Sequence, residues 1–475
     1  MTKELNVRAT DIPGLLVIDL PVHGDNRGWF KENWQREKMR AAGLPDFDPV
    51  QNNISFNTSV GTTRGIHAEP WDKYVSVASG RIFGAWVDLR AGESFGRVVT
   101  VELGPDTAIF VPRGVGNAFQ TLEENTAYTY LVNDHWSADA LTAYSFLNLA
   151  DESAAIDWPI DLAQAELSEK DRKHPRLHEI TPLTPDPLLI VGAGGQLGRE
   201  LVRQLTAQNI PFEAVDRDRL DLGTPEKWRN AFRWRSYRAV INAAAYTAVD
   251  NAETPEGRRE AWAANAHGVA ALASVCEEAN LPLVHVSTDY VFGGDPYNTP
   301  CREDQTGTPT GVYGASKLRG EQAIARVGCH HLIFRTAWLY SRFGKNFVKT
   351  MLHLTATKRE LKVVFDQCGT PTFAGDLAKA LIDIIDQRKL ESNEGIYHYS
   401  NEGVTSWYDF TQMIACLAGN VSCRILPCYS SEYPSPVKRP AYSVLDKTKF
   451  KETFQLAVPY WIDSLQLCIR DLCTQ

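Results

Sequence analysis

The sequence predicts two domains of different fold class: an all-β sandwich or small barrel, followed by an α/β domain with a parallel sheet. Three observations support this prediction. The chain has 475 residues, whereas a domain averages about 150. Short strand patterns separated by turns fill roughly the first 160 residues. Strand and helix patterns then alternate, which is typical of a parallel sheet with crossover helices.

The β part is predicted from runs of β-branched and aromatic residues. Residues 74–89 carry such a run on both sides of a Ser79-Gly80 turn. Residues 98–103 and 107–111 repeat the pattern before a break at 112–114. Short strands at this regular spacing are typical of sandwiches and small barrels.

A proline-rich stretch separates the two parts. Residues 177–187 contain three prolines, each of which fixes φ and lacks an amide donor, so the stretch suits a semi-rigid linker. We place the boundary near Leu183 and expect domains over residues 1–182 and 187–475. Beyond the linker, an apolar strand is followed by an amphipathic helix at 196–208, and further strands are expected at 239–245 and 283–286.

Composition excludes several classes of protein. Lys and Arg number 49 against 58 Asp and Glu, a net charge of −9, which argues against dedicated binding to nucleic acid or anionic membranes. No apolar run approaches the roughly 18 residues that span a bilayer. All nine cysteines lie from Cys276 onward without a C-x-x-C pair, which indicates reduced thiols and a cytoplasmic location.

A glycine-rich loop at residues 192–198 follows the first strand of the α/β part and opens a helix. This context is typical of a loop that binds a dinucleotide pyrophosphate at a helix N-terminus. Asp216 lies 18 residues beyond Gly198, where a carboxylate can accept from a ribose hydroxyl, whereas Arg217 can pair with a 2′-phosphate. The choice between NADH and NADPH therefore stays open. Candidate cofactor-binding residues here are Gly192, Gly195, Gln196, Leu197, Gly198, Asp216, Arg217 and Asp221.

Tyr313 and Lys317 stand four residues apart on a predicted helix, downstream of Thr288 at a strand end. This spacing puts the phenol and the ammonium on one helix face. The lysine charge is expected to lower the pKa of the phenol. Such a tyrosine can deliver a proton to a carbonyl oxygen while hydride reaches its carbon.

These stretches resemble the extended short-chain dehydrogenase/reductase family, and within it the dTDP-4-dehydrorhamnose reductases. The resemblance runs through GAGGQLG, VINAAAYTAVDNAE, VSTDYVF, YGASKLRGE, FRTAWLY, VFDQCGTPT and RPAYSVLD. It implies a Rossmann-type doubly wound sheet with a small substrate-binding subdomain. Tyr313 would be the proton donor, Lys317 would bind the nicotinamide ribose, and Thr288 would polarise the ketone. Further implied residues are Ala243, Ala244, Ala245 and Thr247 for the cofactor, and Arg335, Trp338, Asn346 and Phe347 for the sugar nucleotide. Magnesium is a further cofactor candidate in this family, without ligands that the sequence assigns.

In the β part, His67 follows Arg64-Gly65-Ile66, and Lys73 lies six residues on. A histidine beside a lysine suits abstraction of a proton α to a ketone, because the ammonium stabilises the enolate oxygen. The stretch holds no His-x-His pattern, so we expect neither metal nor cofactor in this domain.

The β part resembles the dTDP-4-dehydrorhamnose 3,5-epimerase family, a cupin-like jelly-roll barrel, over residues 10 to about 177. The motifs are DNRG, QNNIS, RGIH, WVDLR, VPRGVGNAF, DWP and LSEKD. The resemblance implies His67 as base, Asp171 as its orienting partner, Lys73 as enolate stabiliser and Tyr130 as the acid on the opposite face. Implied substrate-binding residues are Arg27, Gln51, Asn53, Arg64 and Asn117.

Together the halves predict one bifunctional enzyme of dTDP-L-rhamnose synthesis. It would epimerise a dTDP-4-keto-6-deoxyhexose at C3 and C5 and then reduce C4 with NADPH or NADH. Asn117, Gly84 and Trp136 depart from the epimerase pattern, and the loop from His67 to Lys73 is short. These departures motivate an alternative with epimerisation at C3 only. A second alternative makes one half a non-catalytic binding or regulatory module. A homodimer is expected from the cupin-like resemblance.

Overall fold

A computed structural model of the chain describes residues 3–45, 48–136, 141, 143–184, 186–293, 298–387, 389–390, 392–433 and 435–473. The chain divides into two compact units, Met1–Pro185 and Asp186–Gln475. The predicted two-domain architecture is therefore confirmed, and each unit is described by itself. Pro185 of the predicted linker lies outside the described residues. Among the described residues, no helix is both long and apolar enough to cross a bilayer.

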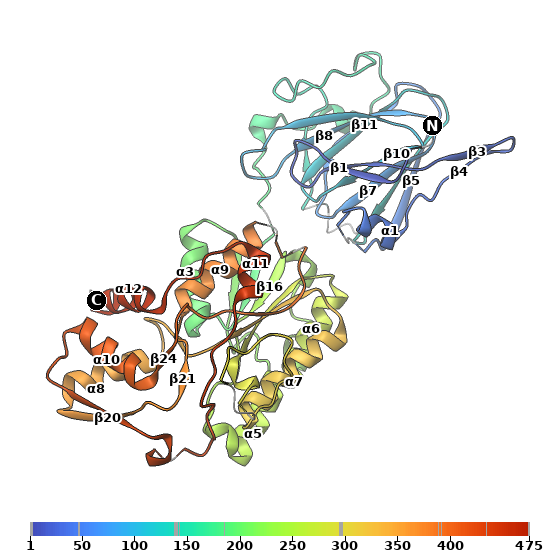
Figure 1. Cartoon of the computed structure of the whole chain (residues 1–475). Coiled ribbons are helices and arrows are strands. Elements are labelled where there is room, and N and C mark those ends of the chain that lie inside the picture. The colour runs from blue at the N-terminus through green and yellow to red at the C-terminus, as the bar shows by residue number, and fades with distance from the viewer. Residues whose placement is uncertain are drawn as a thin grey trace. The chain divides into compact units, whose positions relative to one another are not determined.

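The N-terminal unit is built from two antiparallel sheets (Figure 1). The first has the order β1 (Asn6–Ala9), β2 (Leu16–Asp19), β10 (Thr107–Val111), β7 (Lys73–Ser79), β12 (Thr126–Val132) and β5 (Gln51–Asn57). The second has the order β13 (Ser145–Phe146), β6 (Thr63–Ala68), β11 (Val115–Thr121), β8 (Ile82–Asp88) and β9 (Val98–Leu103). The predicted strands 98–103 and 107–111 coincide with β9 and β10.

A single apolar core lies between these sheets. Val75 and Ile109 of the first sheet pack with Trp86 and Phe119 of the second, and all four are buried. β7 is also covered on its outer face, where Tyr74 packs with Met39 of helix α1 (Arg36–Ala41). Residues 73–77 of β7 are accordingly all buried, including the polar Lys73 and Ser76.

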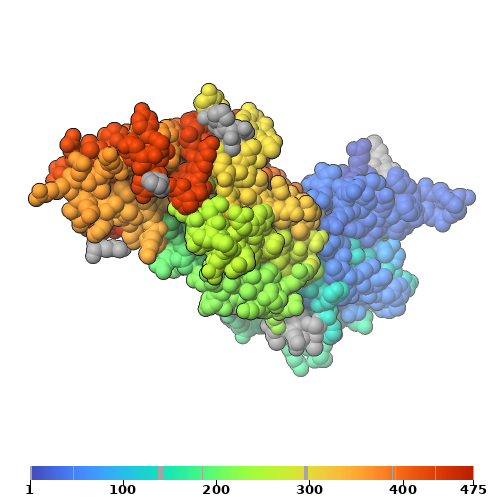
Figure 2. Space-filling view, turned by 90° about the horizontal axis from the view of Figure 1, so that it is seen from below, coloured from blue at the N-terminus to red at the C-terminus, as the bar shows by residue number. Residues whose placement is uncertain are grey.

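A β-hairpin of β3 (His23–Asp25) and β4 (Gly28–Phe30) extends from this unit. It stands away from both sheets in Figure 1, and the blue segment at the right-hand edge in Figure 2 is the same protrusion. Trp29 and Phe30 on this hairpin are 47% and 67% exposed. Because the hairpin stands apart, the unit that carries these aromatic side chains buries little of their surface, and exposed aromatic groups of this kind are typical of contact surfaces.

The C-terminal unit is built on a parallel sheet, as predicted, and this sheet has six strands. Its order is β15 (Phe212–Val215), β14 (Leu188–Val191), β16 (Ala239–Asn242), β17 (Leu283–Thr288), β18 (His331–Thr336) and β23 (Gly395–His398). One face is covered by α3 (Gln196–Ala207), α9 (Ala374–Asp386) and α11 (Thr448–Phe454). The other face is covered by α4 (Pro225–Trp228), α6 (Val269–Glu278) and α7 (Val312–Val327).

A smaller layer of the C-terminal unit carries a second core around Tyr340, Phe410 and Trp461. Its helices are α8 (Phe347–Thr357), α10 (Trp407–Ala418) and α12 (Trp461–Cys473). Its short strands pair as β19 (Leu339–Tyr340) with β22 (Thr372–Phe373), β20 (Glu360–Val364) with β25 (Arg424–Cys428), and β21 (Cys368–Gly369) with β24 (Thr405–Ser406). Before α6, the chain forms α5 (Pro255–Trp262) and a π-helical turn, η5 (Ala263–Gly268).

Candidate active sites

His67 lies near the end of β6, at a close approach between strands. Gly65, two residues earlier, has φ +126°, and a Cβ there would come within 2.5 Å of the Ala118 Cβ on β11. Only glycine tolerates this combination of backbone conformation and contact. The sequence R-G-I-H therefore fixes how closely the His67 strand approaches β11.

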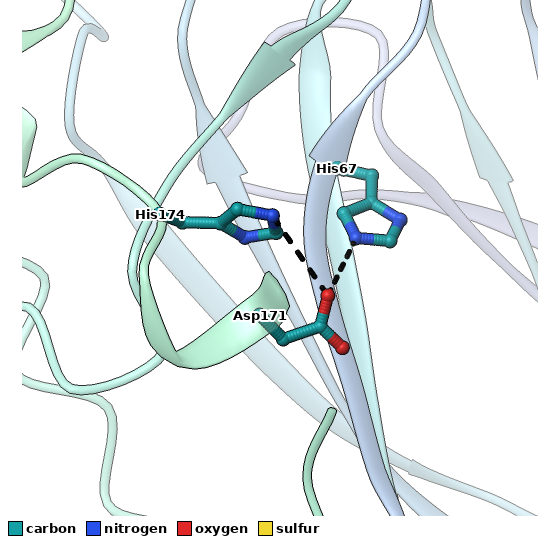
Figure 3. A group of neighbouring side chains, drawn as sticks. All are labelled: His67, Asp171 and His174. Atoms are coloured by element: carbon teal, nitrogen blue, oxygen red, sulfur yellow. Dashed lines mark hydrogen bonds and ion pairs between the residues drawn. The ribbon is translucent and has the colours of Figure 1, made fainter. Parts of the chain in front are cut away.

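Two side chains from one distant segment meet His67 (Figure 3). Asp171 on helix α2 (Glu169–Arg172) places its Oδ1 3.2 Å from His67 Nε2. His174, three residues on, has its Nε2 3.8 Å from the same oxygen and its ring 5.4 Å edge-on from the His67 ring. Because the carboxylate accepts, His67 Nε2 carries the hydrogen and Nδ1 is left as the basic nitrogen.

The electrostatics of this group follow from burial and proximity. Burial opposes ionisation of Asp171, but the hydrogen bond and charge of His67, with His174 and Ser168, outweigh it and lower its pKa. Burial and the neighbouring His67 lower the pKa of His174. Asp171 is therefore charged and His174 neutral at neutral pH. His174, a residue that the sequence analysis missed, is 8% exposed.

Lys73 begins β7 and lies beside Tyr130, with its Nζ 5.5 Å from the centre of the phenol ring. Its ammonium is paired with Glu69 Oε2 at 2.7 Å, and both side chains are buried. The Trp71 indole donates to the same oxygen at 2.6 Å. Burial and the Glu69 charge raise the pKa of Tyr130 to about 12, although Arg64 opposes this, so the phenol keeps its proton at neutral pH.

The expected substrate-binding residues occupy different surroundings. Arg64 is exposed and donates to Asn57, and Gln51 donates to Asn53 on the same strand. Arg27 stands on the protruding hairpin with its side chain 84% exposed, paired only locally with Asp25. The structure therefore does not bring Arg27 to the His67 group within one chain.

Two of the residues that depart from the epimerase pattern, Asn117 and Gly84, have local structural reasons. Asn117, which faces His67 across the β6–β11 ladder, exchanges hydrogen bonds with the buried Tyr128 hydroxyl at 2.9 and 3.2 Å. A Cβ at Gly84 would lie 2.2 Å from the Trp86 ring, so glycine makes room for that core indole. Tyr144, near Trp71, supplies a further phenol whose pKa is raised by burial.

The prediction that this domain holds no metal stays a prediction. Among the residues that the structure describes, His67, Asp171 and His174 are the one group of three potential ligands, with ligand atoms within 4.8 Å of one another. His67 Nε2 and Asp171 Oδ1 already lie at hydrogen-bond distance from each other, which suits a histidine–carboxylate pair.

The C-terminal unit contains a cavity of about 800 Å³ at the carboxyl ends of its parallel strands. Parallel strands end at one edge of a sheet, so the loops that follow them converge there. Of the cofactor residues expected from the sequence, those on the cavity wall are Gly192, Gly195, Gln196, Leu197, Asp216, Arg217, Asp221, Ala243, Ala244, Ala245, Thr247, Tyr313 and Lys317.

The glycine-rich loop is shaped by close backbone contacts. Gly192 has φ +81°, and a Cβ there would lie 2.7 Å from Ala244 Cα. The Gly194 amide donates to Asp216 Oδ1 at 2.7 Å, which ties the loop to the end of β15. Gly198 lies beneath the wall, where a Cβ would meet the Gly192 carbonyl oxygen at 2.2 Å. Its role is therefore close packing of α3 against the loop.

Tyr313 and Lys317 lie on α7 beside Thr288, as predicted from their spacing. The Thr288 hydroxyl hydrogen-bonds to the Tyr313 phenol, yet burial outweighs it and raises the pKa of Tyr313. This differs from the expected lowering by Lys317. The Lys317 ammonium is directed instead at the Val286 carbonyl oxygen, 2.7 Å away. Burial lowers the pKa of Lys317 to about 8, against the opposing charge of Glu321.

The residues expected to face the sugar divide into two groups. Trp338, Asn346 and Phe347 line the cavity, and Trp338 stacks on Trp407 with ring centres 3.5 Å apart. Arg335 instead lies 3% exposed beneath the cavity, in a bidentate ion pair with the buried Glu321. The structure thus gives Arg335 a structural partner in place of the expected sugar contact.

Several wall residues were missed by the sequence analysis. Arg439 lines the cavity and donates both to Asp250 and to the Tyr290 hydroxyl. Lys345 is a further cationic residue on the wall. Asp289, next to Thr288, is buried, and burial raises its pKa to about 6. Arg439 lies in the motif RPAYSVLD, which carried the resemblance but no assigned role.

Comparison with known families divides the chain at the same place. Residues 9–179 match the dTDP-4-dehydrorhamnose 3,5-epimerase family, and residues 186–474 match the family described as RmlD substrate binding domain.

Relatives are found separately for each half. A protein RmlC homolog from Streptococcus pyogenes is 53% identical over 183 residues, covering 38% of this chain and 92% of its own length. A dTDP-4-dehydrorhamnose reductase from Burkholderia thailandensis is 39% identical over 302 residues, covering 61% of this chain and 99% of its own length. The crystal structure of a dTDP-4-dehydrorhamnose reductase from Bacillus anthracis in complex with NADP is 33% identical. It covers 60% of this chain and 99% of its own, with a TM-score of 0.56.

Proposed function

Because this chain belongs to the RmlD substrate binding domain family and carries an N-terminal dTDP-4-dehydrorhamnose 3,5-epimerase domain, we propose that it is a bifunctional enzyme of dTDP-L-rhamnose synthesis. The first half epimerises dTDP-4-dehydro-6-deoxy-D-glucose at C3 and C5, and the second reduces the C4 ketone. The observation that carries this proposal is that each half retains a complete acid–base group: His67 with Asp171, and Tyr313 with Lys317 and Thr288.

In the epimerase half, His67 removes the proton from a carbon next to the C4 ketone. Its Nδ1 takes the proton while its Nε2–H stays hydrogen-bonded to Asp171. The charge of Asp171 stabilises the resulting imidazolium. The electron pair moves onto the ketone oxygen, and Lys73 stabilises the enolate. The Glu69 carboxylate holds Lys73 in place and partly offsets its charge.

Tyr130 returns a proton to the same carbon from the opposite face, which inverts the centre. Its raised pKa, about 12, keeps the phenol protonated and so able to donate at neutral pH. His67 then releases its proton to water and Tyr130 takes one up, so the same cycle at the carbon on the other side of the ketone can complete the double epimerisation. Asn53, Gln51 and Arg64 are proposed to hold the sugar nucleotide.

In the reductase half, Tyr313 donates a proton to the C4 oxygen, which Thr288 polarises. A nicotinamide cofactor held by the glycine-rich loop and Lys317 would supply the hydride that C4 accepts. Burial keeps Tyr313 protonated, so the phenol is available as the acid. Lys317 holds the nicotinamide ribose, and Trp338, Asn346 and Phe347 are proposed to contact the sugar nucleotide.

The residues present fit a dinucleotide. Gly192, Gly194 and Gly195 leave the backbone of the loop open to a pyrophosphate at the N-terminus of α3. Asp216, Arg217 and Asp221 are proposed to hold the adenosine ribose. NADPH is favoured over NADH, because Arg217 can pair with a 2′-phosphate and the Bacillus anthracis relative binds NADP.

The finer architecture is also inferred. We assign residues 1–182 to a cupin-like jelly-roll domain and residues 187–475 to a Rossmann-type short-chain reductase domain with a substrate-binding subdomain. Two facing antiparallel sheets and a parallel sheet with helices on both faces support these assignments.

We further propose that the N-terminal domain forms a homodimer. Edge strand β5 exposes Ile54 and Phe56 at 68% and 59%, and the hairpin exposes Trp29 and Phe30. Burial of such residues against a second copy would stabilise the pair. The dimer would also give Arg27 a route to a substrate phosphate that it lacks within its own chain.

Single-half variants test the proposal. His67→Asn removes the base and Tyr313→Phe removes the acid, and each change leaves the other half intact. We expect His67→Asn to lower exchange of the sugar C3 and C5 protons by at least about 100-fold. Tyr313→Phe should keep that exchange but stop NADPH oxidation, and a mixture of the two variants should regain product. Exchange that persists in His67→Asn would contradict the epimerase assignment.

A further inference from the structure

His285 is a buried titratable residue that the mechanism above does not use. It lies on β17, three residues before Thr288, and is 0% exposed. Its register partner on the neighbouring strand β16 is Asn242. Its imidazole contacts Asn242 through Nδ1 at 3.0 Å and Lys317 Nζ through Nε2 at 3.3 Å. His285 thus connects Asn242 on β16 to Lys317, the lysine of the reductase site.

The hydrogen bonds around Asn242 assign the tautomer of His285. The Ala244 amide donates to Asn242 Oδ1 at 3.1 Å, which fixes the orientation of the Asn242 amide group. Its Nδ2 is therefore the atom that faces His285 Nδ1. Because Nδ2 can only donate, Nδ1 must accept. The hydrogen of the neutral imidazole then lies on Nε2 and is directed at Lys317.

A donor directed at Lys317 changes what that lysine can do. A charged ammonium has three donors and no acceptor, so it repels an N–H group 3.3 Å away. A neutral amine has a lone pair that accepts from the same N–H group. The His285 contact therefore favours loss of a proton from Lys317, whereas the Val286 carbonyl oxygen accepts from Lys317 in either state.

We propose that His285 is a positioning residue of the reductase site which, held as the Nε2–H tautomer by Asn242, disfavours the charged form of Lys317. Lys317, which lines the cavity with Tyr313, then takes up a proton from water and passes it to the Tyr313 phenolate after each reduction. This inference rests on the proposed reductase function. Burial acts in the same direction, because it lowers the pKa of Lys317 to about 8.

The other charged groups around Lys317 and His285 do not account for this effect. Glu321, one turn along α7, opposes it by raising the pKa of Lys317, and its carboxylate is already paired with Arg335. Burial, Lys317 and His331 of β18 lower the pKa of His285 well below its ordinary range. His285 therefore stays neutral, as the tautomer assignment requires.

The tautomer can be measured directly on the resting full-length protein. The chain has 11 histidines, so histidine labelled with ¹⁵N gives a simple NMR spectrum in which His285→Gln identifies the His285 signals. We expect a neutral ring with the proton on Nε2, and an Nε2 signal that moves with a midpoint near pH 8 as Lys317 titrates. An Nδ1–H tautomer, a doubly protonated ring, or a signal unchanged from pH 7 to 9 would overturn the proposal. This measurement needs neither substrate nor reductase activity.

The pH dependence of reduction supplies the second test. The Gln side chain in His285→Gln offers an amide oxygen that accepts from the Lys317 ammonium. We expect the alkaline limb of the kcat profile to move upward by about one pH unit. His331→Gln, a buried histidine on the adjacent strand, should leave the limb in place. An unmoved limb in His285→Gln would overturn the proposal. Absence of reduction in the wild type would contradict the proposed function instead.

Discussion

Asp171→Asn isolates the contribution of one charge to the epimerase half. The asparagine oxygen can still accept from His67 Nε2–H, so the ring orientation is retained while the negative charge is lost. In the wild type the charge acts when His67 becomes an imidazolium, across the 3.2 Å between Nε2 and Oδ1. Two unit charges at that separation interact by about 5 kcal/mol at an effective dielectric constant of about 20.

Solvent reduces this value. The His67 side chain is 33% exposed, and screening of a partly exposed pair leaves about half, or about 2–3 kcal/mol. Because the charge is felt as the proton arrives, most of this energy is lost from the transition state. Each 1.36 kcal/mol is a factor of ten, so proton exchange should slow by about 30- to 150-fold.

The assay is exchange of the C3 and C5 protons of dTDP-4-dehydro-6-deoxy-D-glucose in heavy water without NADPH. Glu169→Gln is the matched control, because it removes one negative charge from the same helix at an 83% exposed side chain. It should keep the wild-type rate. Because Asp171 belongs to the N-terminal unit, the thermal melting transition of that unit, compared with wild type, reports whether the variant is folded. An Asp171→Asn rate within about twofold of wild type would refute the electrostatic role of this carboxylate.

Three further predictions concern stability and cofactor binding. Glu321→Gln leaves the buried Arg335 charge unpaired and should lower the free energy of unfolding of the C-terminal unit by about 3–5 kcal/mol. The loss of reductase activity on heating measures this change in stability, and an unchanged melting temperature would contradict the prediction. Gly198→Ala introduces a Cβ 2.2 Å from the Gly192 carbonyl oxygen and should raise the Kd for NADPH at least about tenfold. Fluorescence titration measures this Kd, and an NADPH affinity equal to that of wild type would contradict the loop geometry. The pKa of Asp171 is lowered from 3.8, so its stabilising charge is present above that pH and is lost as pH falls through the folded pKa. Wild type should therefore lose more melting temperature than Asp171→Asn on acidification below about pH 4; parallel curves would contradict this.

Much of the architecture follows from local sequence pattern. The strands at 98–103 and 107–111 are bounded by turn residues and lie where the sequence predicts them. In the C-terminal unit, Thr288, Tyr313 and Lys317 gather at one cavity because parallel strands end at one edge of the sheet. The spacing of Tyr313 and Lys317 on one helix face is likewise a local property.

The remaining features depend on tertiary packing between distant segments. His174 joins His67 only because helix α2 packs against a strand 104 residues earlier. Arg335 sits in a strand, and the pattern gives no sign that its partner is Glu321 on α7. The raised pKa of Tyr313 results from burial, which spacing alone does not report. These are the points at which prediction from sequence and the structure differ.

The central claim is that one chain epimerises and then reduces one sugar nucleotide. The most direct test incubates the purified protein with dTDP-4-dehydro-6-deoxy-D-glucose and NADPH in heavy water and reads the product by NMR. The account predicts deuterium at both C3 and C5, oxidation of NADPH and a sugar of the L-rhamnose configuration. Deuterium at C3 alone would identify a different 6-deoxyhexose as product. An unlabelled sugar with NADPH unspent would contradict the account.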